Sequence, residues 1–473
     1  MSELSRNPPR KRARGLRVRT GCSTCRARHV KCDERKPACK RCYIGGRLCV
    51  YPLASQAVAN TLGRGAVDQL RETEPPDWDF MQAIRYYKSV IEPAQSSEFE
   101  PTINMDDAFR YFNEDTKFAF TCLTTANRIS ALGRNSGRLL GYGERQQDLS
   151  GLWASHSKYM LLLLEKMNGV MKQTLLEGPK RICRGNSTVI YCLLNLLSCD
   201  LKIKGSLWLA HLNGFLAYMT EIGGAARLLG HNRLQWEFCD LMVRIIKVNT
   251  FAPAHQLLRN EEYSELDIKV YVEASPSNDM PCPAGLLAHI MRITKIRKRV
   301  SLNPSLADAL GPSIQGLFRD IEDFDVEEWV ATSLLGAKEI LPTLGRLFQD
   351  AVHLHALMTL PRQAVLDAHP QASSYESLCL HQRLGLMEHL RRLFPKVQYS
   401  PALLWPVVVA GVAAGAADAD AAQDQTYVDS CLHAIWWQPA SMGDPVYCIE
   451  KLRAFWQSGK TEWEECFYEP TPC

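Results

Sequence analysis

The sequence predicts two parts of different kinds, a small cysteine-rich domain followed by a large all-α domain. Three observations predict this division: the spacing of the first six cysteines, an uneven distribution of charge, and helical periodicity over most of the remaining chain. The chain has 473 residues, of which 46% are hydrophobic, so it is long enough to bury a large core. This composition excludes a chain that is disordered throughout.

Basic residues are concentrated at the N-terminus. The first 51 residues contain 15 Lys and Arg against 3 Asp and Glu, whereas the other 422 contain 40 against 48. The densest run of cations, in residues 1–20, is Arg10, Lys11, Arg12 and Arg14. This run predicts a nuclear localisation signal or a phosphate-binding arm, and a solvated tail is the simpler alternative. A polyanion-binding module joined to a mildly acidic body is therefore expected.

The cysteines of the N-terminal part follow a duplicated pattern. Six of the 17 cysteines repeat the spacing C-x2-C-x6-C twice: Cys22, Cys25, Cys32, Cys39, Cys42 and Cys49. Two residues between thiols allow both to bind one ion, and tetrahedral thiolate ligands suit Zn²⁺. Six thiolates supply two four-coordinate ions only if two are shared, and the duplication makes the first cysteine of each half the shared one. The count predicts a binuclear cluster with two Zn²⁺ ions per chain.

Three other interpretations of these cysteines are a disulfide knot, an iron–sulfur site and a metal-storage patch. A disulfide knot needs an oxidising compartment, but the N-terminus has no apolar segment typical of a secretory signal. Iron–sulfur sites usually use four cysteines at other spacings. A storage patch would not need the cations between the thiols. Zinc is therefore the favoured metal.

Cationic side chains lie between the cysteines, where a short helix from about Ser23 to His29 is expected. Structural zinc requires none of them, whereas a helix docked in a DNA groove needs long donors for base edges and phosphates. A surface that is merely basic is the alternative. The predicted DNA contacts are Arg26, Arg28, His29, Lys31, Lys40 and Arg41.

The segment GCSTCRARHVKCDERKPACKRCYIGGRLCVYP, which starts at Gly21, resembles the fungal zinc binuclear cluster (Zn2Cys6) DNA-binding domain. The resemblance implies that a helix end reads a CGG triplet in double-stranded DNA. The best-known members have lysine at the place of His29, so Arg28 and Lys31 are expected to make the main contacts. It also implies two ligand sets that share Cys22 and Cys39, namely Cys22, Cys25, Cys32 and Cys39 for one ion and Cys39, Cys42, Cys49 and Cys22 for the other.

The composition of residues 53–77, which carry Ser, Gly, Ala and charged residues, predicts a linker. A weak apolar series, Val58, Leu62, Val67 and Leu70, is interrupted by two glycines, so no coiled coil is predicted. The sequence therefore does not decide whether the protein is a monomer or a homodimer.

Helical periodicity dominates residues 78–473. The apolar run from Leu403 to Ala417 is shorter than the roughly 18 residues of a membrane span, so a buried helix and no membrane association are expected. The expected helices include 159–175, 190–201, 208–222, 235–249, 283–300, one long helix over 326–359, 374–394, 401–417 and 427–437.

The stretch LWLAHLNGFLAYMTEIGG from Leu207 resembles a helix of the fungal-specific transcription factor regulatory domain, as do LLWPVVVAGVAA from Leu403 and the Trp456 and Trp463 pair. The resemblances imply the fold class, a small Zn2Cys6 binuclear zinc cluster domain followed by a large all-α helical regulatory domain. The expected divisions are a basic arm over 1–20, the DNA-binding domain over 21–52, the linker over 53–77 and the regulatory domain over 78–473.

Enzyme chemistry is not predicted, because none of the motifs G-x-S-x-G, G-x-G-x-x-G, H-E-x-x-H and G-x4-G-K-[ST] occurs. His353 and His355 would lie on different faces of a helix, so this pair predicts no metal site. The acidic stretch over 320–328 is either an activation segment or, the favoured interpretation, a solvated loop and helix start.

These observations together predict a nuclear, zinc-dependent, sequence-specific regulator of RNA polymerase II transcription. Its expected partners are DNA with CGG-type triplets and the transcription machinery or coactivators. The resemblance suggests control of a metabolic or secondary-metabolite gene cluster. The alternative is an interaction protein anchored to chromatin or RNA, without sequence-specific regulation.

Overall fold

The structure is a computed structural model, and it divides the chain into two compact units at Trp78 and Asp79. We call the first unit the head and the second the body. The described residues are 25, 28–33, 39–44, 78–94, 109–110, 112–135, 137–142, 150–177, 185–222, 235–258, 272, 280–416, 418–439 and 441–472. The predicted arm and linker lie outside them.

The body is all-α, as the periodicity predicts, and its described residues contain no strand. An isolated bridge between Gly141 and Lys204 is the nearest approach to sheet pairing among them. In chain order the helices are α5 (Trp78–Tyr86), α7 (Glu114–Asn135), α8 (Ser150–Glu177), α9 (Gly185–Asp200), α10 (Trp208–Ile222), α12 (Gln235–Thr250), α14 (Ala284–Leu302), α15 (Leu306–Ala309), α16 (Gly311–Glu322), α17 (Val326–Thr332), α18 (Leu341–Thr359), α19 (Arg362–Ala368), α20 (Tyr375–Leu393), α21 (Leu404–Ala413), α22 (Ala421–Trp437), α23 (Asp444–Ser458) and α24 (Trp463–Cys466).

Local sequence explains where several helices begin and end. Ser374 and Ser377 form a reciprocal capping box at the start of α20. Helix α23 ends at Gly459, whose φ of 67° places it in the left-handed region that glycine adopts without steric cost. Pro342 occupies the first turn of α18, where its missing N–H needs no intrahelical partner.

The prediction of a single helix over 326–359 is wrong, because the helical structure is interrupted between α17 and α18. The break allows α17 to fold back against α18. A Cβ atom at Gly345 would lie 2.7 Å from Cγ1 of Val326 and 3.1 Å from the Trp329 ring, so glycine permits this close approach. Helical periodicity continues through the break, since both helices bury one apolar face.

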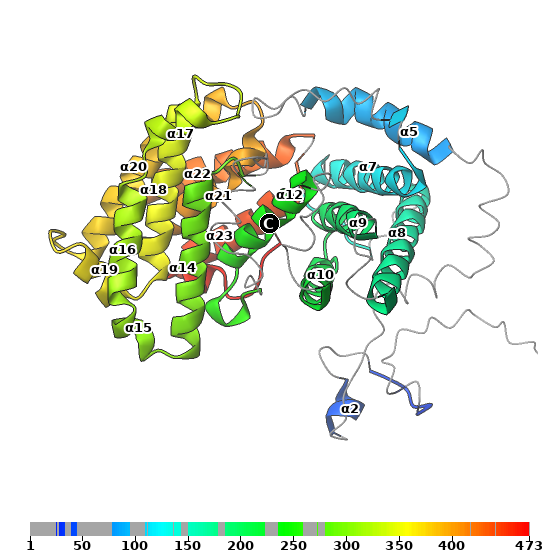
Figure 1. Ribbon diagram of the computed structural model, residues 1–473, viewed down its shortest axis with the longest axis horizontal. Coiled ribbons are helices and arrows are strands. Elements are labelled where there is room, and N and C mark those ends of the chain that lie inside the picture. The colour runs from blue at the N-terminus through cyan, green and yellow to red at the C-terminus, as the bar shows by residue number, and fades with distance from the viewer. Residues whose placement is uncertain are drawn as a thin grey trace, which may run out of the picture. The chain divides into compact units, whose positions relative to one another are not determined.

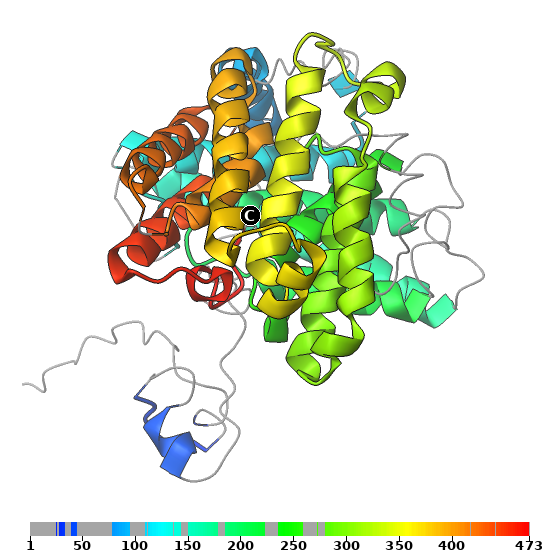
Figure 2. The ribbon, with the colours of Figure 1, turned by 90° about the vertical axis from the view of Figure 1, so that its left-hand side faces the viewer.

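Helices α14, α16, α18 and α20 stand side by side as one group in the body (Figure 1), and Figure 2 turns this group toward the viewer. A second group contains α7, α8 and α9, which contact one another. Helix α12 contacts both groups through α9 and α14.

Helix α21 forms part of the centre of the body, and every residue from Leu404 to Val412 is buried. The prediction of a buried helix in this run is confirmed, although the regular α-helix ends at Ala413. Thr250, the last residue of α12, links distant parts of the chain: its hydroxyl accepts a hydrogen bond from the Trp405 indole at 2.9 Å, and its carbonyl accepts one from the Trp463 indole at 2.8 Å. These bonds join the middle of the chain to its C-terminal end. None of the described helices is long and apolar enough to cross a membrane.

Candidate metal and nucleic-acid site

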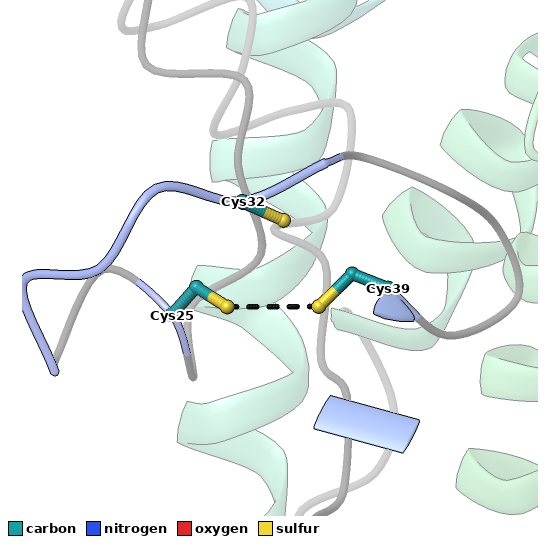
Figure 3. Close-up of side chains that lie close together, drawn as sticks. All are labelled: Cys25, Cys32 and Cys39. Atoms are coloured by element: carbon teal, nitrogen blue, oxygen red, sulfur yellow. Dashed lines mark hydrogen bonds between the residues drawn. The ribbon is translucent and has the colours of Figure 1, made fainter. Parts of the chain in front are cut away.

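The described thiols of the head gather in one place. The Sγ atoms of Cys25 and Cys39 point toward each other at 3.6 Å (Figure 3), and Cys42 Sγ lies 3.9 Å from that of Cys25. Cys25, Cys32 and Cys39 offer Sγ atoms that all lie within 4.8 Å of one another. The duplicated spacing therefore brings four of its six cysteines together, while Cys22 and Cys49 lie outside the described residues.

The sulfur separations fit a tetrahedral zinc–thiolate site. Four sulfurs at about 2.3 Å from an ion are separated by about 3.8 Å along each edge of the tetrahedron. The distance of 3.6 Å between Cys25 and Cys39, which the family resemblance assigns to one ion, is close to this value. The distance of 3.9 Å joins Cys25 to Cys42, which the resemblance assigns to different ions, so the described distances show one compact thiol cluster rather than two separate sites.

The thiol of Cys39 is prepared for metal binding by its hydrogen bonds. Burial raises the pKa of Cys39. Hydrogen bonds from the neighbouring thiols and from the Cys42 backbone N–H, whose nitrogen lies 3.4 Å from Sγ, lower that pKa by more than burial raises it. The resulting pKa lies below the ordinary value for a thiol. Because the thiolate is the form that binds metal, this environment favours ligation.

The first basic segment ends in a tight turn. The Val30 N–H donates to the Cys25 carbonyl at 3.1 Å, and the intervening His29 has a φ of 53°. A bond that spans six residues with a left-handed residue before its donor is the Schellman arrangement that closes a helix. Val30 also packs against the buried cysteines, which supplies the apolar contact that often accompanies it. The sequence predicts a helix that continues to His29, whereas in the structure His29 lies in the turn that ends the helix.

The second half of the head begins its helix at the thiol cluster. Helix α2 (Lys40–Ile44) follows Cys39, and the Asp33 carboxylate accepts a hydrogen bond from the Lys40 N–H at 3.0 Å. A carboxylate at this end of a helix satisfies an orphan donor and favours the helix dipole. No local pattern in the sequence predicts this role of Asp33, which lies seven residues before Lys40.

Cations surround the cluster on its exposed side. Five of the six predicted DNA contacts are described, and all are exposed: Arg28, His29, Lys31, Lys40 and Arg41. Arg26 and the arm residues Arg10, Lys11, Arg12 and Arg14 lie outside the described residues. Because the thiols are turned inward while the cations face solvent, the head presents a basic surface built on a compact thiol core.

The acidic stretch of the body spans the last turn of α16, a short loop and the start of α17. The Asp325 side chain accepts a hydrogen bond from the Glu328 N–H at 2.8 Å and caps α17. Asp320 pairs with Arg292, and Glu327 pairs with Arg346 at 2.6 Å. These contacts give three of the acidic side chains structural partners within the body.

Comparisons with known proteins agree with this site. Residues 20–57 match the fungal Zn(2)-Cys(6) binuclear cluster domain. The chain is 25% identical to the phomenoic acid biosynthesis cluster-specific transcriptional regulator of Leptosphaeria maculans over 95% of this chain and 88% of that protein. It is 30% identical to the aspercryptin biosynthesis cluster-specific transcription regulator of Emericella nidulans over 50% of this chain and 38% of that protein. No solved structure matches the chain significantly.

The relatives are named as transcription regulators, and their similarity extends well beyond the cysteines. This favours sequence-specific regulation over the alternative of an interaction protein anchored to chromatin or RNA. Residues 20–57 thus form a fungal Zn(2)-Cys(6) binuclear cluster domain, and the chain is similar over most of its length to transcription regulators of this kind.

Proposed function

We propose that this chain regulates a metabolic or secondary-metabolite gene cluster by binding double-stranded DNA with CGG-type triplets. The observation that carries the proposal is the compact thiol cluster beside exposed Arg28 and Lys31. Two relatives named as regulators of biosynthesis clusters support the choice of target genes. The similarity to the Leptosphaeria maculans protein covers 95% of the chain and therefore includes the body as well as the head.

Two Zn²⁺ ions per chain would hold the head together. The proposed ligand sets share Cys22 and Cys39, with Cys25 and Cys32 completing one set and Cys42 and Cys49 the other. The described thiols fit this chemistry, because their separations match the edge of a tetrahedral sulfur site. Bound zinc would supply the folding free energy that so small a core lacks.

The predicted DNA contacts would divide between bases and phosphates. We assign Arg28 and Lys31 to the base edges and nearest phosphates, and Arg26, Lys40 and Arg41 to the phosphate backbone. His29 sits in the closing turn, where its backbone carbonyl as well as its imidazole can meet DNA. Arg10, Lys11, Arg12 and Arg14 would direct the chain to the nucleus.

The bounds proposed for the chain are an arm over 1–20, the DNA-binding domain over 21–52, a linker over 53–77 and the helical regulatory domain over 78–473. The body would pass regulation to the transcription machinery without catalysing a reaction. Sedimentation of the DNA complex distinguishes binding as a monomer from binding as a homodimer.

Fluorescence anisotropy of the full chain on labelled duplexes tests the proposal. We expect at least about tenfold tighter binding to a CGG duplex than to one with the triplet shuffled, since each wrong base pair costs about 1–3 kcal/mol. With about four to six phosphate contacts, the log–log dependence of affinity on salt should have a slope of about −4 to −5. Equal affinity for both duplexes would instead support a protein anchored by charge alone.

Alanine variants test which of the exposed side chains contact DNA. Arg28→Ala and Lys31→Ala should each weaken binding to the CGG duplex, and a variant at a base-reading residue should also narrow the preference over the shuffled duplex. Lys172→Ala, at an exposed lysine of α8, is the matched control and should change neither.

A further inference from the structure

A second group of metal-binding side chains lies in the body, far in sequence from the thiol cluster. It consists of Glu322, the last residue of α16, His353 in the middle of α18, and His369, which directly follows α19. His353 Nε2 lies 3.4 Å from Glu322 Oε1, and His369 Nε2 lies 3.5 Å from the same oxygen. Three separate elements thus direct one donor atom each toward a common point.

The position of Glu322 relative to His353 is fixed by hydrogen bonds. Gln349 lies one helical turn before His353 on α18, and its amide donates to the carbonyls of Ile321 at 2.8 Å and Glu322 at 3.2 Å. These bonds join the C-terminal turn of α16 to α18. The Phe318 ring packs edge-on against both imidazoles, with centroid distances of 5.2 Å to His353 and 4.6 Å to His369. The donor atoms are therefore held by packing as well as by the backbone.

The histidines are oriented as metal ligands usually are. His369 Nδ1 lies 2.8 Å from the Val365 carbonyl, and because a carbonyl only accepts, Nδ1 donates the proton. Nε2 is then the nitrogen that faces Glu322, and a backbone carbonyl on the other nitrogen is the common second partner of a metal-bound histidine. His353 is only 7% exposed, and neither of its ring nitrogens has a well-aligned hydrogen bond among the described residues. Burying a ring nitrogen whose nearest acceptor is the imperfectly aligned Glu322 carboxylate is costly, and a metal ion bound to Nε2 would offset that cost.

The distances fit Zn²⁺. Nitrogen and oxygen ligands lie about 2.0–2.1 Å from zinc, so two ligands of a tetrahedral site are about 3.3–3.4 Å apart. The separations of 3.4 and 3.5 Å match this edge. The C-terminal end of α16 also carries the negative end of the helix dipole, which favours a cation there. Glu322 has a side chain that is 52% exposed, so water can reach the fourth position.

The other nearby histidine does not take part. The His355 ring packs edge-on against Trp463 and Trp405, with centroid distances of 4.7 and 5.7 Å. No sequence spacing connects His353 with His369 and Glu322, which lie at three different elements.

We propose that Glu322, His353 and His369 bind one Zn²⁺ ion, which clips α16, α18 and the end of α19 together. The site is independent of the thiol cluster and of DNA binding. Its simplest competitor is a carboxylate paired with two imidazoles and no metal.

Zinc content tests the proposal on the full chain. The wild type, His369→Gln and Glu322→Gln are dialysed to equilibrium against one zinc-buffered solution, and zinc per chain is measured by mass spectrometry of the elements. We expect both variants to hold one zinc ion fewer than the wild type. The difference does not depend on how many ions the thiol cluster holds.

The matched control is His389→Gln, because His389 also pairs with a carboxylate, that of Asp350 at 2.8 Å, but belongs to no three-ligand group among the described residues. It should keep the zinc content of the wild type. Glu322 is half-exposed, so its variant is expected to fold, and circular dichroism checks this. Equal zinc content in the wild type, His369→Gln and Glu322→Gln overturns the proposal in favour of the metal-free ion pairs.

Discussion

The head and the body are stabilised by different interactions. Among the described residues of the head, the buried cluster consists of three cysteines, with Val30 and Cys32 packed against them. The body has one large apolar core, to which elements from α7 to α24 contribute, and smaller apolar clusters beside it. Burial of apolar area accounts for the stability of the body, whereas the head has too little of it and depends on metal. The two regions should therefore respond independently to the same kind of perturbation.

The largest expected effect is the loss of the head alone. Cys39→Ala removes a thiol that contacts Cys25 at 3.6 Å and that we propose bridges both ions. Structural zinc contributes on the order of 10 kcal/mol or more to folding, so we expect binding to the CGG duplex to disappear. The thermal transition of the body, followed by helical circular dichroism, should stay unchanged.

Cys282→Ala is the control, since Cys282 is a buried cysteine of the body. This variant should bind DNA like the wild type. If Cys39→Ala also lowers the transition of the body, the two regions are not independent.

The opposite experiment removes a side chain from the core of the body. Trp463 is 1% exposed, packs against the Phe251 and His355 rings and donates to the Thr250 carbonyl. Trp463→Ala should lower the free energy of unfolding of the body by about 3–5 kcal/mol, because it leaves a cavity and an unpaired acceptor. Denaturant unfolding measures the loss, and DNA binding at low temperature should persist.

Trp437→Ala provides the comparison, because Trp437 is 54% exposed. It should change the stability of the body by less than about 1 kcal/mol. A similar loss in both variants would mean that Trp463 does not carry the core contacts described above.

The difference between the regions also explains what the sequence could predict. Regular patterns with local causes were read correctly: the thiols at Cys25, Cys32 and Cys39 meet as their spacing requires, and α10 spans Trp208–Ile222 as its periodicity predicts. The fold class is likewise confirmed. These features depend on residues that are neighbours in the chain.

Features that depend on tertiary contact were missed. The break before α18 follows from α17 packing onto Gly345, and periodicity does not record this approach. Glu322, His353 and His369 lie on three elements that only the packed body brings together. His29 adopts a positive φ, which is uncommon for residues other than glycine although histidine adopts it more often than most, and no cysteine spacing reveals it.

A pH-dependent loss of stability is expected in the body. His355 is fully buried, and its pKa is well below the ordinary value because burial, and then the charge of Arg297, disfavour the imidazolium. The unfolded chain binds a proton below about pH 6.5, whereas the folded chain does not. Stability at this residue therefore falls as the pH decreases below about 6.5, by up to about 1.4 kcal/mol per pH unit.

His355→Leu removes the titrating group at similar volume and should flatten the decline in stability between about pH 6.5 and pH 5. Denaturant midpoints at several pH values measure the slope. His381→Gln, at an exposed histidine of α20, should keep the slope of the wild type. If the stability of His355→Leu declines with falling pH as steeply as that of the wild type, His355 does not remain neutral in the folded body.

The smallest expected effects come from one strained residue in each region. His29 in the head and Ala337 in the body are the two described residues other than glycine with positive φ, 53° and 49°. Glycine adopts this conformation without the Cβ clash, a difference of about 1 kcal/mol that is partly offset because glycine also gives the unfolded chain more freedom. Ala337→Gly should therefore raise the thermal midpoint of the body slightly and leave zinc binding by the head unchanged.

His29→Gly should tighten zinc retention by the head against a chelator, by up to about fivefold, without moving the transition of the body. His29→Val, in which a β-branched residue must adopt the same turn, should loosen zinc retention. If His29→Gly and His29→Val retain zinc equally well, the left-handed turn does not limit the stability of the head.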